Sequence, residues 1–383
     1  MNSSYFTTRT TCRLCGSADM AKVVPLAALP VASPNVGRAG LVHETAPADV
    51  WQCDACGHLQ LATIVNPEFQ HRNFQYFTGI SLGLREHFGR LIDGLAERGD
   101  IGADKFVIDI GSNDGSLLRL VQAKGAKVLG IDPAEKIAKA ATDAGIPTLA
   151  EFFDKGLAAK IAAEHGKANV VISNNTVANI DELDGFFAGI DSVLAEDGII
   201  VVETQYALDM IEKTLLDVVY HEHISYFATK PTQSFFAARG YELVSAERIA
   251  PKGGSIRFIA QRVGGSRKVD ANVAELIKAE TDAGFYDGRL FDDFNDRIAQ
   301  LGRTIRERLE TARRETGRAL AFGASVGCAA LIHYFDLGDT IDAIFDDTPL
   351  TNEVRTAEGS IPVLSGSQLM TETPGEGCGR AGR

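Results

Sequence analysis

Residues 106–115, which read Phe-Val-Ile-Asp-Ile-Gly-Ser-Asn-Asp-Gly, constrain the fold of this chain more than any other stretch. The apolar run indicates a buried strand, and Gly111 and Gly115 indicate a tight turn before a helix-forming segment. A second apolar segment, 127–131, is followed by Asp132, which is the layout of a nucleotide-type site in a doubly wound sheet. In such a site backbone N–H groups at the helix start receive polar ligand groups, and the acid accepts hydrogen bonds from a ribose diol.

The turn fits two classes of ligand, a dinucleotide and S-adenosylmethionine. Its glycines are spaced Gly111-x-x-x-Gly115, whereas the dinucleotide fingerprint is Gly-x-Gly-x-x-Gly. The spacing therefore favours S-adenosylmethionine. An NAD-dependent oxidoreductase built on the same fold is the alternative.

Further apolar runs between residues 104 and 205 extend the pattern. They do not alternate with polar residues, which indicates strands covered on both faces and hence a parallel sheet. We expect strands at 106–110, at 127–131, near Leu149, at 169–173 and at 198–203. Ligands of such sheets bind beyond the carboxyl ends of the strands. The residues at these ends are the 111–115 turn, Asp132, Phe152, Asn174 and Glu203.

Length and charge narrow the classes of function. A chain of 383 residues can form two or three domains with sizeable cores. The net charge of −13 argues against general nucleic-acid or acidic-membrane binding. No apolar run approaches the roughly 20 residues of a membrane helix, and residues 1–13 lack the apolar core of a signal peptide. We therefore expect a cytoplasmic protein whose six cysteines are free thiols or metal ligands.

Four cysteines form two matched pairs, Cys12 with Cys15 and Cys53 with Cys56, and a glycine follows each pair. Such turns point two sulfurs at one ion, and four thiolates complete a tetrahedral zinc shell without an open position. We predict a structural zinc site; two redox pairs or disulfides are the alternative. A unit this small has little core, so the metal would supply much of its folding energy.

The rest of the chain carries one polar stretch and a second α/β pattern. Residues 217–227 are densely polar and aromatic, and two strands are expected near 241–249 and 255–261. The turn between these strands carries two positive charges, from Lys252 and Arg257. A charged helical spacer and two strand-containing segments follow, at 268–316, 319–327 and 341–349.

In this order the motifs resemble the nucleotide-sugar C-methyltransferases, most of all the tetronitrose C-methyltransferase type. These are zinc-bearing, S-adenosylmethionine-dependent enzymes that methylate a carbon next to a keto group. The resemblance covers about residues 10–364. It rests on the two cysteine knuckles, Tyr76 before Gly79 and Ser81, the Gly111–Gly115 turn, Phe152-Phe153, Tyr220-His-Glu-His223, Gly253-Gly-Ser-Ile-Arg257 and Phe322-Gly323-Ala324.

The resemblance implies a role for each matching position. Cofactor binding is implied for Asp109, Gly111, Asn113, Gly115, Asp132, Phe152, Asn174 and Ser81. Catalysis is implied for Tyr76, Tyr220, Glu222 and His223. Substrate binding is expected of Asn179, Lys252 and Arg257, although a solvated basic turn explains the last two equally well. In the family a histidine often stands where this chain has Asn179, and another where it has Lys252.

The proposed chemistry explains why such residues are needed. A C–H bond next to a ketone is weakly acidic, so methylation of that carbon requires a base that forms an enolate. A histidine suits this role, and we expect His223 to be the base. Tyr220 or Tyr76 would donate to the enolate oxygen, and Glu222 would orient a histidine or bond a sugar hydroxyl. Because an extended segment would point Tyr220 and His223 to opposite faces, the site requires an irregular loop. A structural polar cluster is the alternative.

The expected fold class is α/β: a class I methyltransferase Rossmann-like sheet between an N-terminal zinc-binding domain and a C-terminal Rossmann-like unit. The tail after Leu364 is rich in Gly and Arg, which makes that last unit look incomplete. The expected domains are a zinc-binding domain at 1–65, a helical connector at 66–103 with a helix over 82–98, a methyltransferase domain at 104–262, and a helical spacer with a sugar-nucleotide-binding unit at 263–383.

The expected ligands are S-adenosylmethionine, structural Zn²⁺ and a small-molecule nucleotide-sugar. Neither a nucleic acid nor a membrane is expected as a partner, and a monomer and a homodimer both fit. Besides the methyltransferase and the oxidoreductase, a non-catalytic cofactor-binding or assembly protein is a third hypothesis.

Overall fold

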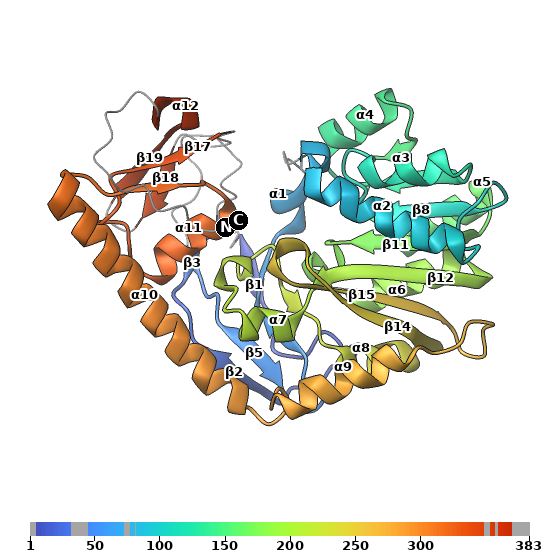
Figure 1. The fold of residues 1–383 in the computed structure, drawn as a ribbon. Coiled ribbons are helices and arrows are strands. Elements are labelled where there is room, and N and C mark those ends of the chain that lie inside the picture. The colour runs from blue at the N-terminus through green and yellow to red at the C-terminus, as the bar shows by residue number, and fades with distance from the viewer. Residues whose placement is uncertain are drawn as a thin grey trace.

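A computed structural model describes residues 5–31, 45–72, 77–80, 82–347, 353–356 and 359–369. The chain forms an N-terminal β unit, a central α/β domain and a C-terminal α/β unit (Figure 1). The long helix α10, Arg289–Thr316, runs along the left of the molecule and leads to the C-terminal unit. Two of the predicted site residues, Tyr76 and Ser81, lie outside the described residues.

The central domain is organised around a seven-stranded sheet in the order β10-β9-β8-β11-β12-β15-β14. Strands β8 to β12 pair in parallel, and β15 is antiparallel to both of its neighbours. This confirms the predicted fold class and adds an antiparallel hairpin at one edge. The bounds are β8 Phe106–Ile110, β9 Lys127–Ile131, β10 Thr148–Leu149, β11 Ala168–Asn174, β12 Leu194–Gln205, β14 Tyr241–Ile249 and β15 Ser255–Arg262.

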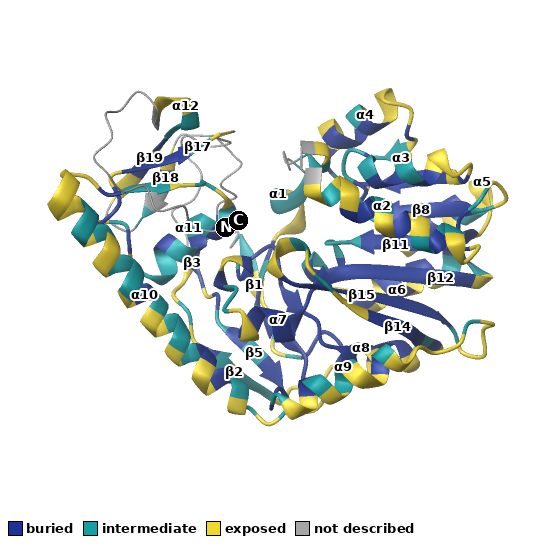
Figure 2. Cartoon of the chain, in the orientation of Figure 1, coloured by how far each residue is buried: buried dark blue, intermediate teal, exposed yellow. Residues whose placement is uncertain are grey.

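Helices cover both faces of this sheet. Along β8, Val107 joins the apolar cluster formed with α2 and α3, whereas Ile108 joins the cluster formed with α5 and α6. Successive residues of a strand point to opposite faces, so both must be apolar when both faces are covered. The sheet is accordingly buried throughout its centre (Figure 2). The helices are α2 Leu82–Glu97, α3 Ser116–Ala123, α4 Glu135–Asp143, α5 Lys155–His165 and α6 Leu183–Val193.

The N-terminal unit shares a sheet with the central domain. Its strands β2, β5 and β6 are extended by β13, Ser225–Tyr226, which comes from the central domain. Ser225 pairs with Gln60, and Tyr226 pairs with Leu59. The bounds are β1 Phe6–Thr8, β2 Met20–Val24, β3 Leu29–Pro30, β4 Thr45–Ala46, β5 Val50–Cys53, β6 Leu59–Leu61 and β7 Thr63–Val65.

Short elements connect these parts and surround the carboxyl edge of the central sheet. They include the connector helices before α2 and the turns on either side of the predicted polar stretch. Their bounds are α1 Pro67–His71, η1 Thr78–Ile80, η2 Val177–Asn179, α7 Ala207–Glu212, η3 Leu216–Val218, α8 Thr229–Ala237 and η4 Pro251–Gly253.

The C-terminal unit is a small sheet in the order β16-β17-β19-β18. Strands β16, β17 and β19 are parallel, and β18 is antiparallel to β19. Residues 370–383 of the predicted tail lie outside the described residues. The bounds in this unit are β16 Leu320–Phe322, α11 Val326–Tyr334, β17 Ala343–Asp346, β18 Glu353–Thr356, β19 Gly359–Ser365 and α12 Gly366–Leu369. Helix α9, Ala271–Asp282, precedes α10 and packs against β14 of the central domain.

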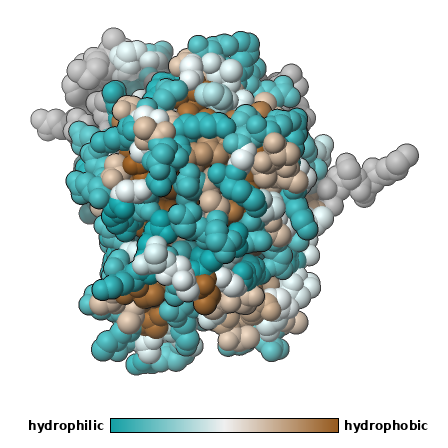
Figure 3. Space-filling view, turned by 90° about the vertical axis from the view of Figure 1, so that its right-hand side faces the viewer, coloured by the Kyte–Doolittle hydropathy of each residue, from teal (hydrophilic) through white to brown (hydrophobic). Residues whose placement is uncertain are grey.

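The surface is mainly hydrophilic on the side of the molecule that carries the central domain. Figure 3 shows hydrophilic side chains over most of this face, with apolar residues in small separate groups. Large apolar side chains with high exposure are Val263, Val269 and Phe322. In the part of the chain that the structure describes, no helix combines the length and the apolar character needed to cross a bilayer.

Candidate functional site

A cavity of 1680 Å³ lies where the three parts of the molecule meet. Its wall includes the turn after β8, the ends of β9 and β11, the loop after η3, and the start of α11 in the C-terminal unit. The cavity therefore opens at the carboxyl edge of the parallel strands, as predicted. Predicted site residues in its lining are Asp109, Gly111, Asn113, Asp132, Phe152, Asn174, Asn179, Tyr220, Glu222, His223 and Lys252.

The glycine turn is shaped by the loop that follows β11. Gly111 has a φ of 80°, and a Cβ placed on it would lie 1.9 Å from Oγ1 of Thr176. Only a residue without a side chain fits this position. Gly115, with a φ of 73°, is the N-cap of α3 and packs against Ile146. The N–H groups of Gly111 and Ser112 donate to the carbonyl of Ile131 at 2.8 Å and 3.2 Å, so hydrogen bonds to the end of β9 hold the turn in place.

Two buried carboxyl groups stand beside the turn. Asp109, on β8, has one oxygen, Oδ1, without a hydrogen-bond partner among the described residues. Burial, and secondarily the charge of Asp132, raises the pKa of Asp109 to about 8. Burial also raises the pKa of Asp132, although its carboxylate accepts hydrogen bonds from the N–H groups of Asn113 and Ala134, both at 2.9 Å. A cationic or hydroxyl-bearing ligand would relieve both groups.

The amide side chain of Asn113 closes the turn against the connector. Its Oδ1 accepts hydrogen bonds from the N–H groups of Thr78 and Asp114, each at 2.9 Å. Asp114 in turn accepts a hydrogen bond from the N–H of Gly79 through Oδ2 at 2.8 Å. The side chain predicted to touch the cofactor therefore also holds the connector over the turn.

Several polar atoms at the end of β11 and on the loop that follows it have no protein partner among the described residues. They include both side-chain atoms of Asn174 and the Oδ1 atoms of Asn175 and Asn179. All three residues line the cavity. Unpaired buried polar atoms are costly, so a polar ligand or water must satisfy them. Together with the glycine turn and Asp109, these atoms fit the polar groups of S-adenosylmethionine. Phe152 adds an aromatic side chain to the cavity wall, and the guanidinium carbon of Arg72 lies 4.8 Å from the centre of its ring.

The predicted catalytic stretch is the irregular loop that the sequence required. The N–H of His223 donates to the carbonyl of Tyr220 at 2.9 Å, which closes a tight turn. The turn brings Tyr220, Glu222 and His223 to one cavity wall. His221 points elsewhere, and its Nε2 donates to the carbonyl of Pro47 at 3.2 Å.

The hydrogen bonds of His223 define its neutral tautomer. Nδ1 lies 2.8 Å from the carbonyl of Val218, so it must carry the proton. The unprotonated Nε2 then faces Nε2 of Gln205 at 3.2 Å and the hydroxyl of Tyr220 at 3.4 Å. Burial, followed by the charge of Lys252, lowers the pKa of His223 to about 3. The ring is therefore neutral at physiological pH, but it is a weak base.

The pKa of Glu222 is shifted in the opposite direction to that of His223. Burial raises its pKa to about 7, and only the charge of Lys252 opposes this rise. Glu222 is 8% exposed and lines the cavity. Lys252 sits on η4 with a left-handed φ of 56° and lines the same cavity. A carboxyl group with a pKa near 7 can both accept and release a proton at physiological pH.

The prediction of substrate binding by Arg257 is not supported. Arg257 lies on β15 opposite Glu203 of β12, and its guanidinium bonds the carboxylates of Glu203 at 3.1 Å and Glu247 at 2.8 Å. His87 of α2 bonds the other oxygen of Glu203 at 2.7 Å. Arg257 does not line the cavity. Glu203 is distant from Arg257 in sequence and becomes its neighbour only through strand pairing, so the local sequence gave no sign of this ion pair.

The structure adds residues that sequence reasoning missed. Gln205, two positions after Glu203, contacts His223, and Thr176 fixes the glycine turn. His71, on α1, also lines the cavity, and burial lowers its pKa to about 4. Gln205 is the last residue of β12, and its place at the carboxyl end of a buried strand was a usable signal, whereas no local pattern marked His71.

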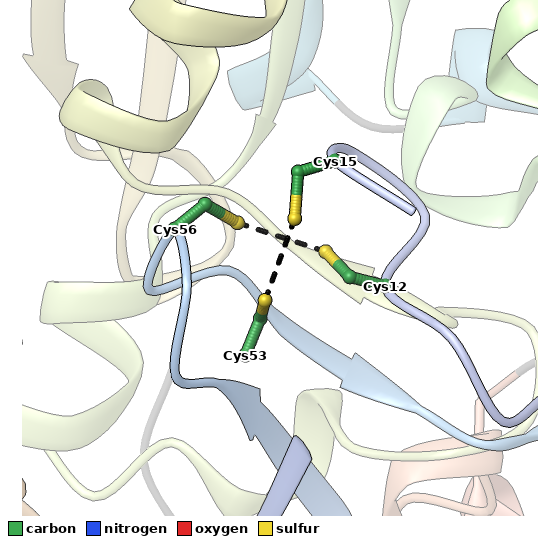
Figure 4. Close-up of side chains that lie close together, drawn as sticks. All are labelled: Cys12, Cys15, Cys53 and Cys56. Carbon is green, nitrogen blue, oxygen red and sulfur yellow. Dashed lines mark hydrogen bonds between the residues drawn. The ribbon is translucent and has the colours of Figure 1, made fainter. Parts of the chain in front are cut away.

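The four cysteines converge as predicted. Figure 4 shows Cys12, Cys15, Cys53 and Cys56 pointing their sulfurs toward a common centre from two facing loops. These sulfurs all lie within 4.8 Å of one another. Four thiols so placed suit a tetrahedral zinc ion, and they leave no position for a substrate.

Three family models match consecutive parts of the chain. A zinc binding domain matches residues 12–70, a methyltransferase domain matches 84–246, and a C-methyltransferase C-terminal domain matches 250–376. The chain is also 28% identical over 368 residues to the C-methyltransferase NovU of Streptomyces niveus, covering 95% of this chain and 87% of the relative.

Solved structures similar to this chain cover about half of it. The magnesium protoporphyrin IX methyltransferase ChlM of Synechocystis PCC 6803 with bound SAH is 17% identical, with a TM-score of 0.38, over 50% of this chain and 90% of that chain. The PH0226 protein of Pyrococcus horikoshii OT3 is 14% identical, with a TM-score of 0.39, over 52% and 96%. The three matched domains, together with the similarity to a C-methyltransferase over most of both chains, show an S-adenosylmethionine-dependent C-methyltransferase with a zinc-binding domain.

Proposed function

We propose that this enzyme methylates a carbon adjacent to the keto group of a nucleoside-diphosphate keto-deoxy sugar, through an enolate formed by a base. One observation carries the proposal. The Tyr220–His223 turn and the glycine turn at Gly111 line the same cavity, although they are about a hundred residues apart in sequence. Proton removal and methyl transfer can therefore occur on one bound substrate.

The cofactor end of the cavity is the wall around the glycine turn. When bound there, S-adenosylmethionine supplies an electrophilic methyl group. The backbone at Gly111 and the carboxylate of Asp109 would receive the methionine end, and Asp132 would accept hydrogen bonds from the ribose. Phe152 and Asn174 would border the adenosine. A cationic neighbour favours the charged form of Asp109 and so offsets the burial that raises its pKa to about 8.

We assign the proton transfer to Glu222 rather than to His223. A base works best when its pKa lies near the operating pH. The pKa of Glu222 is about 7, whereas that of His223 is about 3. In this assignment the Glu222 carboxylate takes the proton from carbon, and the C–H electron pair becomes the enolate. Bound S-adenosylmethionine would supply the methyl group, whose bond to sulfur would break as its bond to the enolate carbon forms, with S-adenosylhomocysteine as the leaving group. His223, neutral and fixed through Val218 and Gln205, shapes the wall beside it.

Lys252 supplies a positive charge to the cavity. It lines the cavity, and its charge lowers the pKa of both Glu222 and His223, which supports a role close to the reacting atoms. We therefore assign Lys252 to the enolate oxygen instead of the substrate diphosphate. The hydroxyl of Tyr220 already faces Nε2 of His223 at 3.4 Å and would need to rotate to donate to the substrate.

The nucleotide end of the substrate would reach toward the C-terminal unit. The cavity extends to Ser325 and Val326 at the start of α11, where the unpaired N–H groups of a helix favour anionic groups. Gly327 packs against the backbone of Asp217, with the carbonyl oxygen 2.3 Å from where a Cβ would be, so the helix start is held close to the catalytic loop.

Ligand titration separates this function from its alternatives. We expect the purified enzyme to bind S-adenosylhomocysteine and not NADH in isothermal titration calorimetry. A panel of keto-deoxy sugar nucleotides with isotopically labelled S-adenosylmethionine should then yield a product labelled on carbon. Tight binding of NADH alone would support the oxidoreductase, and zinc and cofactor binding without methyl transfer to any member would support a non-catalytic protein.

A further inference from the structure

Arg13 lies inside the first cysteine knuckle, between the ligand residues Cys12 and Cys15. Its side chain is completely buried, with 0% exposure. Burying a guanidinium is expensive unless its hydrogen bonds are met, so a buried arginine in a short turn needs an explanation. Zinc binding does not explain it, because the cysteine sulfurs alone can complete the zinc shell.

The guanidinium of Arg13 reaches out of the N-terminal unit into the central domain. Nη1 donates to the carbonyl of Leu61 at 2.6 Å and to the carbonyl of Ile224 at 3.0 Å. Nε donates to Oδ1 of Asp181 at 2.8 Å. The backbone N–H of Arg13 donates to the side chain of Gln60 at 2.8 Å, which fixes the knuckle end of the residue.

These contacts belong to two loops that line the cavity. Ile224 follows His223 directly, and its N–H donates to the carbonyl of Ala178 at 2.8 Å. Asp181 follows η2, which carries the cavity residue Asn179. One guanidinium therefore ties together the loop with the predicted catalytic residues, the facing loop after β11, and the zinc-binding knuckle.

We propose that Arg13 is a positioning residue through which the zinc-bearing knuckle holds the loops 220–224 and 177–182 in place. This proposal depends on the proposed function in one respect: it takes these two loops to be walls of the catalytic site. A flat guanidinium with several donors can join a carboxylate and two carbonyls at fixed angles, which an ammonium cannot do. Charge-assisted hydrogen bonds of this kind are roughly twice as strong as neutral ones.

Hydrogen–deuterium exchange on the full, zinc-loaded chain tests the proposal without substrate or turnover. In Arg13→Met we expect exchange at residues 177–182 and 218–226 to become about tenfold faster or more, with one zinc retained per chain. Exchange in a reference segment at 106–131 should be unchanged. Arg13→Lys should restore protection only in part. Unchanged exchange in both loops of zinc-replete Arg13→Met would overturn the proposal.

Two further variants distinguish positioning from general stabilisation. Arg9 also bonds Asp181, at 3.2 Å, and its other hydrogen bonds go to Thr11 and Glu182 rather than to the 218–226 loop, so Arg9→Met should leave that loop protected. Asp181→Ala removes one end of the Arg13 contacts and should loosen only the 177–182 loop. If Arg13→Met fails to fold or loses zinc, Asp181→Ala still tests the proposal. Unchanged protection of residues 177–182 in Asp181→Ala would show that the contact with Arg13 does not hold this loop.

Discussion

The pH dependence of the reaction separates the two candidate bases. If Glu222 takes the proton, kcat/KM must follow the ionised fraction of a carboxyl group whose pKa is about 7. Only the ionised form accepts a proton, so activity is present above that pKa and is lost as the pH falls. The ionised fraction is about ten-elevenths at pH 8 and about one-eleventh at pH 6, a tenfold loss. If His223 were the base, with a pKa of about 3, kcat/KM would stay flat to about pH 4.

The measurement is exchange of the substrate proton for deuterium with S-adenosylhomocysteine bound, which reports proton removal without methyl transfer. Glu222→Gln should lower this exchange by about 10²–10⁴-fold and remove the inflection near pH 7, while binding of S-adenosylhomocysteine is retained. His223→Asn should slow the reaction but keep the inflection. A flat profile between pH 5 and 8 in the wild-type enzyme, or an unshifted inflection in Glu222→Gln, would refute the assignment.

Other consequences concern the cofactor turn, the sheet and the metal. Gly111→Ala should weaken S-adenosylhomocysteine binding at least about tenfold in titration calorimetry, because the added Cβ would meet Thr176. The matched control is Gly145→Ala: Gly145 has a φ of 87° and open space around it, so this change should lower stability and leave binding unchanged. Arg257→Met should lower the free energy of unfolding, measured in urea, by about 3 kcal/mol, because it leaves the buried Glu203 without its arginine partner. An increased KM for the sugar nucleotide would contradict this structural role. Cys53→Ser should abolish bound zinc in metal analysis and lower the Tm; full zinc occupancy would contradict a four-cysteine site.

Local patterns predicted those features whose physics is local. The cysteine knuckles, the glycine turn at 111–115 and the strand at 106–110 each depend on residues close in sequence, and the structure confirms them. The hairpin strands β14 and β15 also match their predicted ranges to within one residue at each end. Steric limits at positive φ and the burial of both sheet faces leave little choice at such positions.

Features set by distant partners were not predictable in the same way. The positive charge of Arg257 suggested phosphate binding until strand pairing placed it opposite Glu203. Glu222 was expected to orient a histidine or to bond a sugar hydroxyl, yet burial raises its pKa to about 7, the value of an effective base. No sequence pattern encodes how deeply a loop is buried. The sequence carried no signal for the role of Arg13, because its partner Ile224 lies on another domain.

The shared sheet has a consequence for how the chain is made. Strand β13 supplies residues 225–226 to the sheet that also contains β2, β5 and β6. On the ribosome the first residues emerge long before residue 226, so the N-terminal unit must wait with an unpaired strand edge at β6 while the intervening chain is synthesised. Exposed strand edges invite wrong pairing. Early capture of zinc by the cysteines would keep this unit folded during the delay, which makes metal supply during translation a determinant of yield.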